Sequence, residues 1–183
     1  ILGTDTLGSL QDRLGEALLP AIVARRGEAG ALEALVDPFS AGFVAGRLVL
    51  AFDAPADALA RWREGAAKSD VMDTGARRYM LSADSAREAA SVRLAGATFV
   101  PGLSLSADDV TQRFGAPAAV QAGGEGLQTW LYPDRGLAIA LQPGRKAVLQ
   151  YVAPPDFERR LRPVMAPAAS DRTPARTTPP TTR

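Results

Sequence analysis

The side chains that could act on a substrate are limited here to carboxylates, hydroxyls, arginines and two lysines, because the 183 residues include no Cys and no His. The lack of Cys excludes disulfides, thiolate nucleophiles and Cys-based metal sites. The lack of His removes the commonest general base and the Ser-His-Asp arrangement. An enzyme would have to use carboxylates, as two-carboxylate glycosidases do. We therefore expect a protein that binds and does not catalyse, with no cofactor and no metal.

Two short motifs suggest chemistry, and each has a simpler interpretation. Asp108 and Asp109 follow Ser106, so they fit the first turn of a helix that the Ser106 hydroxyl caps. The glycine-rich run at 123–126 lacks the G-x-x-x-x-G-K-[ST] pattern, so it indicates a flexible turn and not a phosphate loop. A carboxylate hydrolase stays an alternative without a defined arrangement; its candidate residues are Asp53, Glu125 and Asp134.

Three aromatic residues, Trp130, Tyr132 and Tyr151, form the candidate partner-binding site. Alternation along an extended segment at 127–132 puts Trp130 and Tyr132 on the same face. If a helix covers the aliphatic face of the next strand, at 136–141, the aromatics lie on the opposite face above its alanines. Because Trp and Tyr are enriched at protein interfaces, this face would bind another protein. The alternative is that the aromatics pack against the N-terminal half of the chain.

A basic cluster near the C-terminus is the second candidate surface. It could contact anionic lipid headgroups or an acidic partner, and a solvated surface is the alternative. Its members are Arg145, Lys146, Arg159, Arg160 and Arg162. Two further pairs, Arg25-Arg26 and Arg77-Arg78, are isolated in the sequence. The net charge of +1 is too small to favour nucleic acid as a partner.

Helices are predicted from three- and four-residue spacing of apolar residues and from capping residues. Residues 5–26 carry this pattern, with a kink or break at Pro20. Residues 28–36 predict a shorter helix that stops at Asp37-Pro38. Further helices are expected from the cap at Asp53-Ala54-Pro55 to about Lys68, at 82–90, from Ser106 to Gly115, and at 156–161.

Strands are predicted where branched and aromatic residues gather, at 46–52, 77–81, 91–100, 127–132, 136–141 and 147–152. The connections at 133–135 and 142–145 have the length and composition of hairpin turns. The sequence therefore predicts an α+β fold in which helices pack on an antiparallel β-sheet. In its C-terminal part, a helix is followed by a three-stranded meander.

Three regions are predicted along the chain. An N-terminal α+β region covers 1–90, and a second α+β module covers 91–162. The Pro-, Thr- and Arg-rich tail at 163–183 has no apolar periodicity. Such a segment cannot bury enough surface to offset the entropy of ordering, so we expect it to be disordered.

Segment 99–152 resembles the small-protein-A/outer-membrane-lipoprotein-A family, the BamE-like lipoproteins, which share their fold with β-lactamase inhibitor protein. The resemblance rests on Gly102-Leu103-Ser104, a helix carrying Val110, the stop at Phe114-Gly115-Ala116-Pro117, and Trp130-x-Tyr132 before the strand at 136–141. Family members are typically envelope proteins of Gram-negative bacteria that bind other proteins without a cofactor.

The resemblance implies a non-enzymatic periplasmic interaction module, such as a scaffold or assembly factor, whose partner is another envelope protein. An inhibitor or ligand sensor that binds through the sheet face is the alternative. The chain begins at Ile1, and we expect that a signal peptide or membrane anchor precedes this residue. The oligomeric state stays open.

Overall fold

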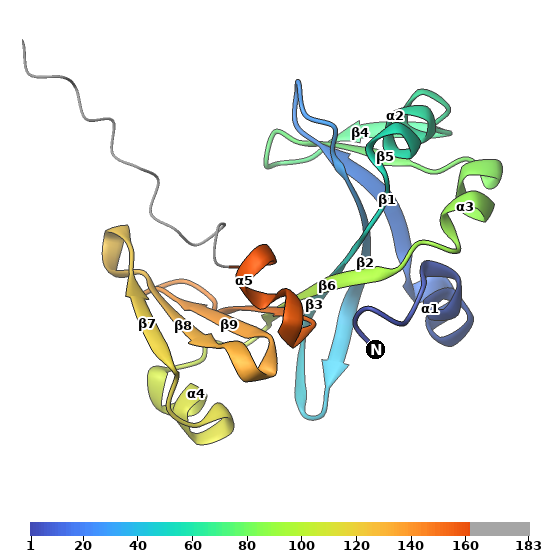
Figure 1. The fold of residues 1–183 in the computed structure, drawn as a ribbon. Coiled ribbons are helices and arrows are strands. Elements are labelled where there is room, and N and C mark those ends of the chain that lie inside the picture. The colour runs from blue at the N-terminus through green and yellow to red at the C-terminus, as the bar shows by residue number, and fades with distance from the viewer. Residues whose placement is uncertain (162–183) are drawn as a thin grey trace, which may run out of the picture.

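Ten strands pair into one continuous antiparallel sheet in the computed structural model, which describes residues 1–161 (Figure 1). Their order across the sheet is β4-β5-β1-β2-β3-β6-β10-β9-β8-β7. The strands are β1 (Leu19–Ala24), β2 (Ala31–Ala41), β3 (Val44–Phe52), β4 (Lys68–Val71), β5 (Arg77–Met80), β6 (Leu94–Pro101), β7 (Ala119–Ala122), β8 (Gln128–Tyr132), β9 (Leu137–Leu141) and β10 (Val148–Val152). The α-helices are α1 (Leu7–Leu14), α2 (Ala56–Glu64), α3 (Ala83–Ala89), α4 (Ala107–Phe114) and α5 (Phe157–Arg160). The predicted α+β class is confirmed.

The first predicted helix is wrong beyond its first two turns. Thr6 caps α1 through a hydrogen bond from the Ser9 backbone N–H, and the helix ends at Gly15, whose φ is 57°. Only glycine adopts such a conformation without strain, so Gly15 stops the helix. After one 3-10 turn the chain enters β1, which pairs with both β2 and β5. Pro20 thus lies in a strand, at a position that β5 does not reach.

The helix predicted at 28–36 is also wrong, because this segment enters β2. Leu32, Ala34 and Val36 are buried and the residues between them are less so, which is the two-residue period of a strand. Ala, Leu and Glu favour helices locally, and pairing with strands on both sides overrides that preference. Strand β2 also runs through Asp37-Pro38, where its register with β3 shifts.

Other predicted elements are confirmed. The strand at 46–52 is part of β3, and the helix predicted after Asp53 is α2, which buries Leu59 and Trp62. Asp53 does not cap α2, whose N-cap residue is Pro55, and its carboxylate pairs with Arg160. Ser82 caps α3, and the strands predicted at 77–81 and 91–100 correspond to β5 and β6.

The C-terminal part of the sheet follows α4. Ser106 and Asp109 form the predicted capping box, and Gly115, whose φ is 76°, ends the helix. Strands β8, β9 and β10 lie at the predicted positions, and β7, which was not predicted, forms the edge of the sheet beyond them.

Strand β6 joins the two parts of the sheet, since it pairs with β3 on one side and with β10 on the other. The predicted regions 1–90 and 91–162 therefore share one set of strand hydrogen bonds. The predicted tail at 163–183, together with Arg162, lies outside the described residues.

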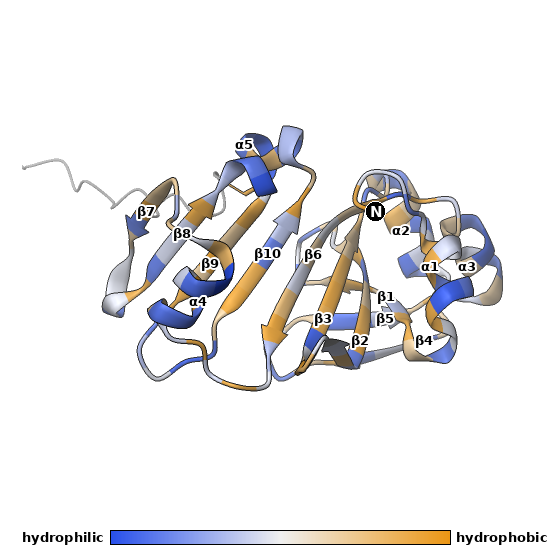
Figure 2. Cartoon of the chain, turned by 90° about the horizontal axis from the view of Figure 1, so that it is seen from below, coloured by the Kyte–Doolittle hydropathy of each residue, from blue (hydrophilic) through white to orange (hydrophobic). Residues whose placement is uncertain are grey.

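The helices α1–α4 cover one face of the sheet, and α5 covers part of the opposite face (Figure 1). On one face, α1, α2 and α3 bury a core around Ile22, Leu32 and Leu50, and α4 buries a second core around Ile139 and Leu149. On the other face, α5 packs Phe157 and Leu161 against β8, β9 and β10. Figure 2 shows hydrophobic residues along the central strands and hydrophilic residues on the helices α3 and α4.

Candidate functional site

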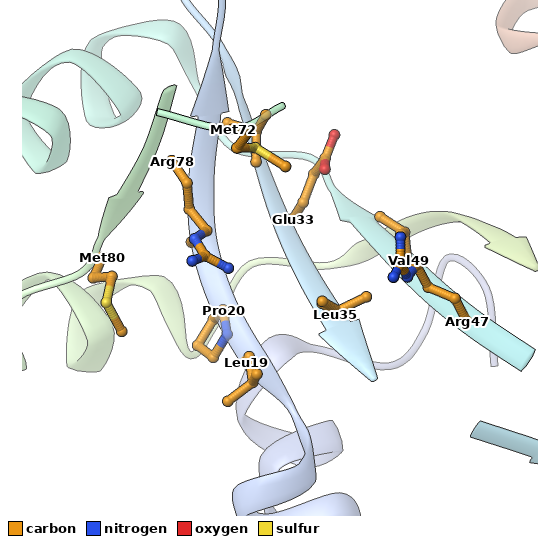
Figure 3. Close-up of a pocket in the computed structure, with 11 residues that line it drawn as sticks. Leu19, Pro20, Glu33, Leu35, Arg47, Val49, Met72, Arg78 and Met80 are labelled. Atoms are coloured by element: carbon orange, nitrogen blue, oxygen red, sulfur yellow. The ribbon is translucent and has the colours of Figure 1, made fainter. Parts of the chain in front are cut away.

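The face that carries α5 has no helix over its N-terminal part within residues 1–161, and a groove of about 300 Å³ lies there (Figure 3). We call it the sheet groove. It crosses β5, β1, β2 and β3, with Met72 from the β4–β5 hairpin at one side. Its apolar lining residues are Leu19, Pro20, Ala21, Val23, Leu35, Val49, Met72 and Met80, and its charged ones are Glu33, Arg47 and Arg78.

Strand register brings these residues together from distant parts of the sequence. Leu19 pairs with Leu35, and Leu35 pairs with Val49, so three aliphatic side chains form a row across β1, β2 and β3. The next row contains Met80, Ala21 and Glu33. Because side chains alternate along a strand, the neighbours of these residues point to the opposite face and form the core under α1–α3.

The apolar lining of the groove is unusually open to solvent for aliphatic side chains. Leu19 is 54% exposed and Met80 is 44% exposed, while Leu35 and Val49 are half-buried. Contiguous exposed apolar surface with a polar rim is typical of a binding surface. Met suits such surfaces because its flexible thioether adapts to different partners.

In the described part of the chain, Glu33 is the one carboxylate that lines the groove. Burial raises the pKa of its side chain above the ordinary value. Within residues 1–161 its carboxylate has no hydrogen bond or ion pair, although it stands among aliphatic side chains. A half-buried acid without a partner is unfavourable for the free protein and available to a cation or a donor group.

The two arginines of the groove are already paired with acids. Arg47 Nε lies 3.0 Å from Asp37 Oδ2. Arg78 donates from Nε and Nη2 to Asp70 Oδ2, at 3.1 and 2.6 Å. These two pairs are neutral overall, so the uncompensated charge of the groove is that of ionised Glu33.

This arrangement can hold an apolar group that carries one positive charge or one hydrogen-bond donor. With a single carboxylate it lacks the second acid of a two-carboxylate hydrolase. No cluster of three or more acidic side chains that could hold a metal ion occurs within residues 1–161.

The aromatic residues of the candidate partner-binding site lie on the α4 side of the sheet. Trp130 pairs with Ile139, while Tyr132 and Tyr151 both pair with Leu137. The prediction that these aromatics stand above alanines is therefore wrong, because they share the face of the aliphatic residues. Tyr132 is buried, and its hydroxyl donates to the Gly115 carbonyl at the end of α4. Trp130 and Tyr151 are half-buried, and their role in partner binding stays a prediction.

The predicted basic cluster is not brought together by the fold. Arg145 and Lys146 are exposed in the β9–β10 turn, before β10 begins, while Arg159 and Arg160 belong to α5, after β10 ends. Arg159 pairs with Asp156. Arg160 pairs with Asp53 and Asp156, so the positive charge of α5 is compensated within the chain.

The carboxylates considered for catalysis are also separate. Asp53 is bound by Arg160. Strand β8 separates Glu125 from Asp134, since one precedes it and the other follows it. Asp109 accepts hydrogen bonds from the Ser106 hydroxyl and backbone, which lower its pKa, as expected for a capping residue.

The sheet groove was not predicted from the sequence, because the segments of β1 and β2 were interpreted as helices. The signal that could have found it is the two-residue alternation of Leu32, Ala34 and Val36. Interpreted as a strand, this segment puts Glu33 and Leu35 together on the opposite face.

Comparison of this chain with models of protein families, with curated proteins and with solved structures gave no match. None of the helices within residues 1–161 has the length and apolar character needed to span a bilayer.

Proposed function

We propose that this chain is a non-enzymatic interaction module that binds a partner protein in the sheet groove. The bound segment is apolar and carries one Lys or Arg side chain, which pairs with Glu33. The observation that carries the proposal is the Glu33 carboxylate, which has no partner within residues 1–161 and lies in an open apolar surface. Binding would cover Leu19 and Met80 and would give Glu33 an ionic partner.

We also propose a location in the cell envelope, with another envelope protein as partner. This part of the proposal is supported by the resemblance of segment 99–152 to the BamE-like lipoproteins. In this resemblance of sequence motifs, α4 and strands β8–β10 correspond to the helix and meander of the family.

Selection from a phage-displayed peptide library on the full-length protein tests the mode of binding. We expect selected peptides to share a short apolar run around one Lys or Arg. Their affinity should fall about tenfold or more for Glu33→Gln, because a charge-assisted contact is lost. Leu35→Asp should abolish binding, since it places a charge in the aliphatic row.

A control is Val120→Asp, which places the same charge on an exposed apolar residue of the edge strand β7. This variant should bind the selected peptides like the wild type. Peptides without a basic residue, or peptides that bind Leu35→Asp as well as the wild type, would contradict the proposal.

A ligand sensor is the second candidate function, and the volume of the groove favours it. About 300 Å³ is at the lower end of the range for small-molecule sites. Octylammonium, below its micelle-forming concentration, should then raise the unfolding temperature of the wild type but not of Glu33→Gln. Octanoate should have no such effect, because its charge is like that of Glu33.

A further inference from the structure

Four arginines from three separate segments surround a second hollow, on the opposite side of β5 from the sheet groove. Arg25 and Arg26 belong to the β1–β2 connection, Arg63 to the last turn of α2, and Arg77 to β5. The hollow has a volume of about 370 Å³ and is completed by residues that include Val71, Gly75 and Tyr79. We call it the arginine hollow.

Alternation along β5 separates the two sites. Arg77 and Tyr79 line the arginine hollow, while Arg78 and Met80 line the sheet groove. Arg77 and Arg78 therefore lie on opposite faces of the sheet. Arg77 lies in the arginine hollow with Arg25 and Arg26, which are far from it in the sequence. The fold thus creates a concentration of positive charge that the sequence order does not show.

Arg63 is held in place at the wall of the hollow. Its Nη1 donates to the carbonyl oxygens of Glu28 and Ala29, at 2.7 and 3.2 Å. Its guanidinium carbon lies 5.7 Å from the centroid of the Tyr79 ring, a cation–π distance. Arg77 Nη1 donates to Ser69 Oγ at 3.1 Å. These contacts use neutral acceptors, so neither guanidinium charge is compensated by an acid of residues 1–161.

The side chains of Arg25 and Arg26 are exposed and have no hydrogen bond or ion pair within residues 1–161. Among residues 1–161 no acid lines the hollow, although Glu28, Glu64 and Asp73 are close to it in the sequence. Elsewhere in the described chain seven arginines have an acidic partner, namely Arg13, Arg47, Arg61, Arg78, Arg87, Arg159 and Arg160. The arginine hollow is therefore a local excess of four positive charges in a chain of net charge +1.

We propose that the arginine hollow binds a phosphate or diphosphate group. Arg presents several N–H donors in a planar fork that matches phosphate oxygens, and such charge-assisted hydrogen bonds are among the strongest in proteins. The volume is sufficient for one such group with some of its hydration. A bound anion would offset the mutual repulsion of the four guanidinium groups. This site is independent of the partner proposed for the sheet groove.

Isothermal titration of the full-length protein with inorganic phosphate and with pyrophosphate tests this site, against sodium chloride at equal ionic strength. The wild type should bind pyrophosphate more tightly than phosphate, and both more tightly at low salt. The double variant Arg25→Gln/Arg26→Gln should lose about tenfold or more in affinity. Arg77→Lys should also weaken binding, because it keeps the charge but loses the fork.

The matched control is Arg145→Gln/Lys146→Gln, which removes two positive charges from exposed residues of the β9–β10 turn. It should bind pyrophosphate like the wild type, and thermal unfolding of every variant checks that it is folded. Measurable pyrophosphate binding of equal affinity in the wild type and in Arg25→Gln/Arg26→Gln would overturn the proposal.

A second arm distinguishes a lipid headgroup from a soluble phosphate. Vesicles of phosphatidylglycerol in phosphatidylcholine are compared with vesicles of phosphatidylcholine alone. Association with the anionic vesicles that requires Arg25 and Arg26, without measurable pyrophosphate binding, supports a lipid headgroup as the source of the phosphate. Pyrophosphate binding without vesicle association supports a soluble ligand. Failure of both arms overturns the site and leaves the proposal for the sheet groove unaffected.

Discussion

Glu33 is the residue at which stability and binding are expected to conflict. Its carboxylate lies among aliphatic side chains without a partner in the described part of the chain. Such a group destabilises the free protein when it is ionised, and natural proteins retain destabilising groups chiefly at functional sites.

Replacing Glu33 by Gln should stabilise the free protein at neutral pH. Burial raises the pKa of Glu33, so the folded chain binds this proton more tightly than the unfolded chain does. The resulting stabilisation is present at acidic pH and is lost as the pH rises through the folded pKa. In urea unfolding, the free energy of unfolding of Glu33→Gln should therefore be larger than that of the wild type at about pH 7. The difference between the two should shrink toward about pH 4.

Glu16→Gln is the matched control, since it removes an exposed carboxylate from the turn before β1. This variant should not show the same dependence on pH. A difference between Glu33→Gln and the wild type that stays constant across the pH range would show that Glu33 is not destabilised by burial.

At the scale of single elements, the sequence predicted best where capping residues and turns act locally. The Ser106 cap, the Gly115 stop and the strands β8–β10 depend on residues near in sequence. The segment of β2 was mispredicted because its Ala, Leu and Glu residues favour helices, and that of β1 because it continues the three- and four-residue apolar spacing of α1. The strand pairing of both segments depends on distant residues.

The candidate sites were less predictable than the elements. The sheet groove needs the register of four strands, and the arginine hollow needs three segments that are far apart in the sequence. The aromatic face was misplaced for the same reason. Alternation correctly put Trp130 and Tyr132 on one face, but only the pairing with β9 determines which face that is.

Removal of the α4 cap tests the role of local interactions in this element. Ser106 Oγ accepts a hydrogen bond from the Asp109 backbone N–H at 3.1 Å. Ser106→Ala should lower the free energy of unfolding by about 1 kcal/mol, as is typical for loss of an N-cap. Ser104→Ala, at an exposed residue before the helix, is the control and should have little effect. Equal stability of both variants in denaturant unfolding would show that the cap does not limit stability.

For the molecule as a whole, β6 determines whether the two parts of the sheet unfold together when one of them is destabilised. It pairs with β3 and β10, so the cores under α1–α3 and under α4 are parts of one hydrogen-bonded sheet. We therefore expect one cooperative unfolding transition for the described chain.

The two tryptophans of the chain can report on the two cores separately, because Trp62 lies in the first and Trp130 packs on the second. In a Trp130→Phe background, Ile139→Ala removes a fully buried side chain from the second core. This change should lower the free energy of unfolding by about 2–5 kcal/mol. It should also shift the unfolding transition that Trp62 fluorescence reports, although Trp62 lies in the other core. An unchanged Trp62 transition would mean that the regions unfold independently.

If the sheet groove is a docking surface, site-specific photo-crosslinking in the intact cell should capture the partner there. A photoreactive phenylalanine derivative replaces Leu19 in the groove or Val120 on β7, two residues that are 54% and 50% exposed. Val120 pairs with Trp130, so this position also monitors the aromatic side of the sheet. We expect a discrete protein adduct from position 19, which is lost when Glu33→Gln is added, and none from position 120. An adduct from position 120 alone, or one from position 19 that is indifferent to Glu33→Gln, would contradict this expectation.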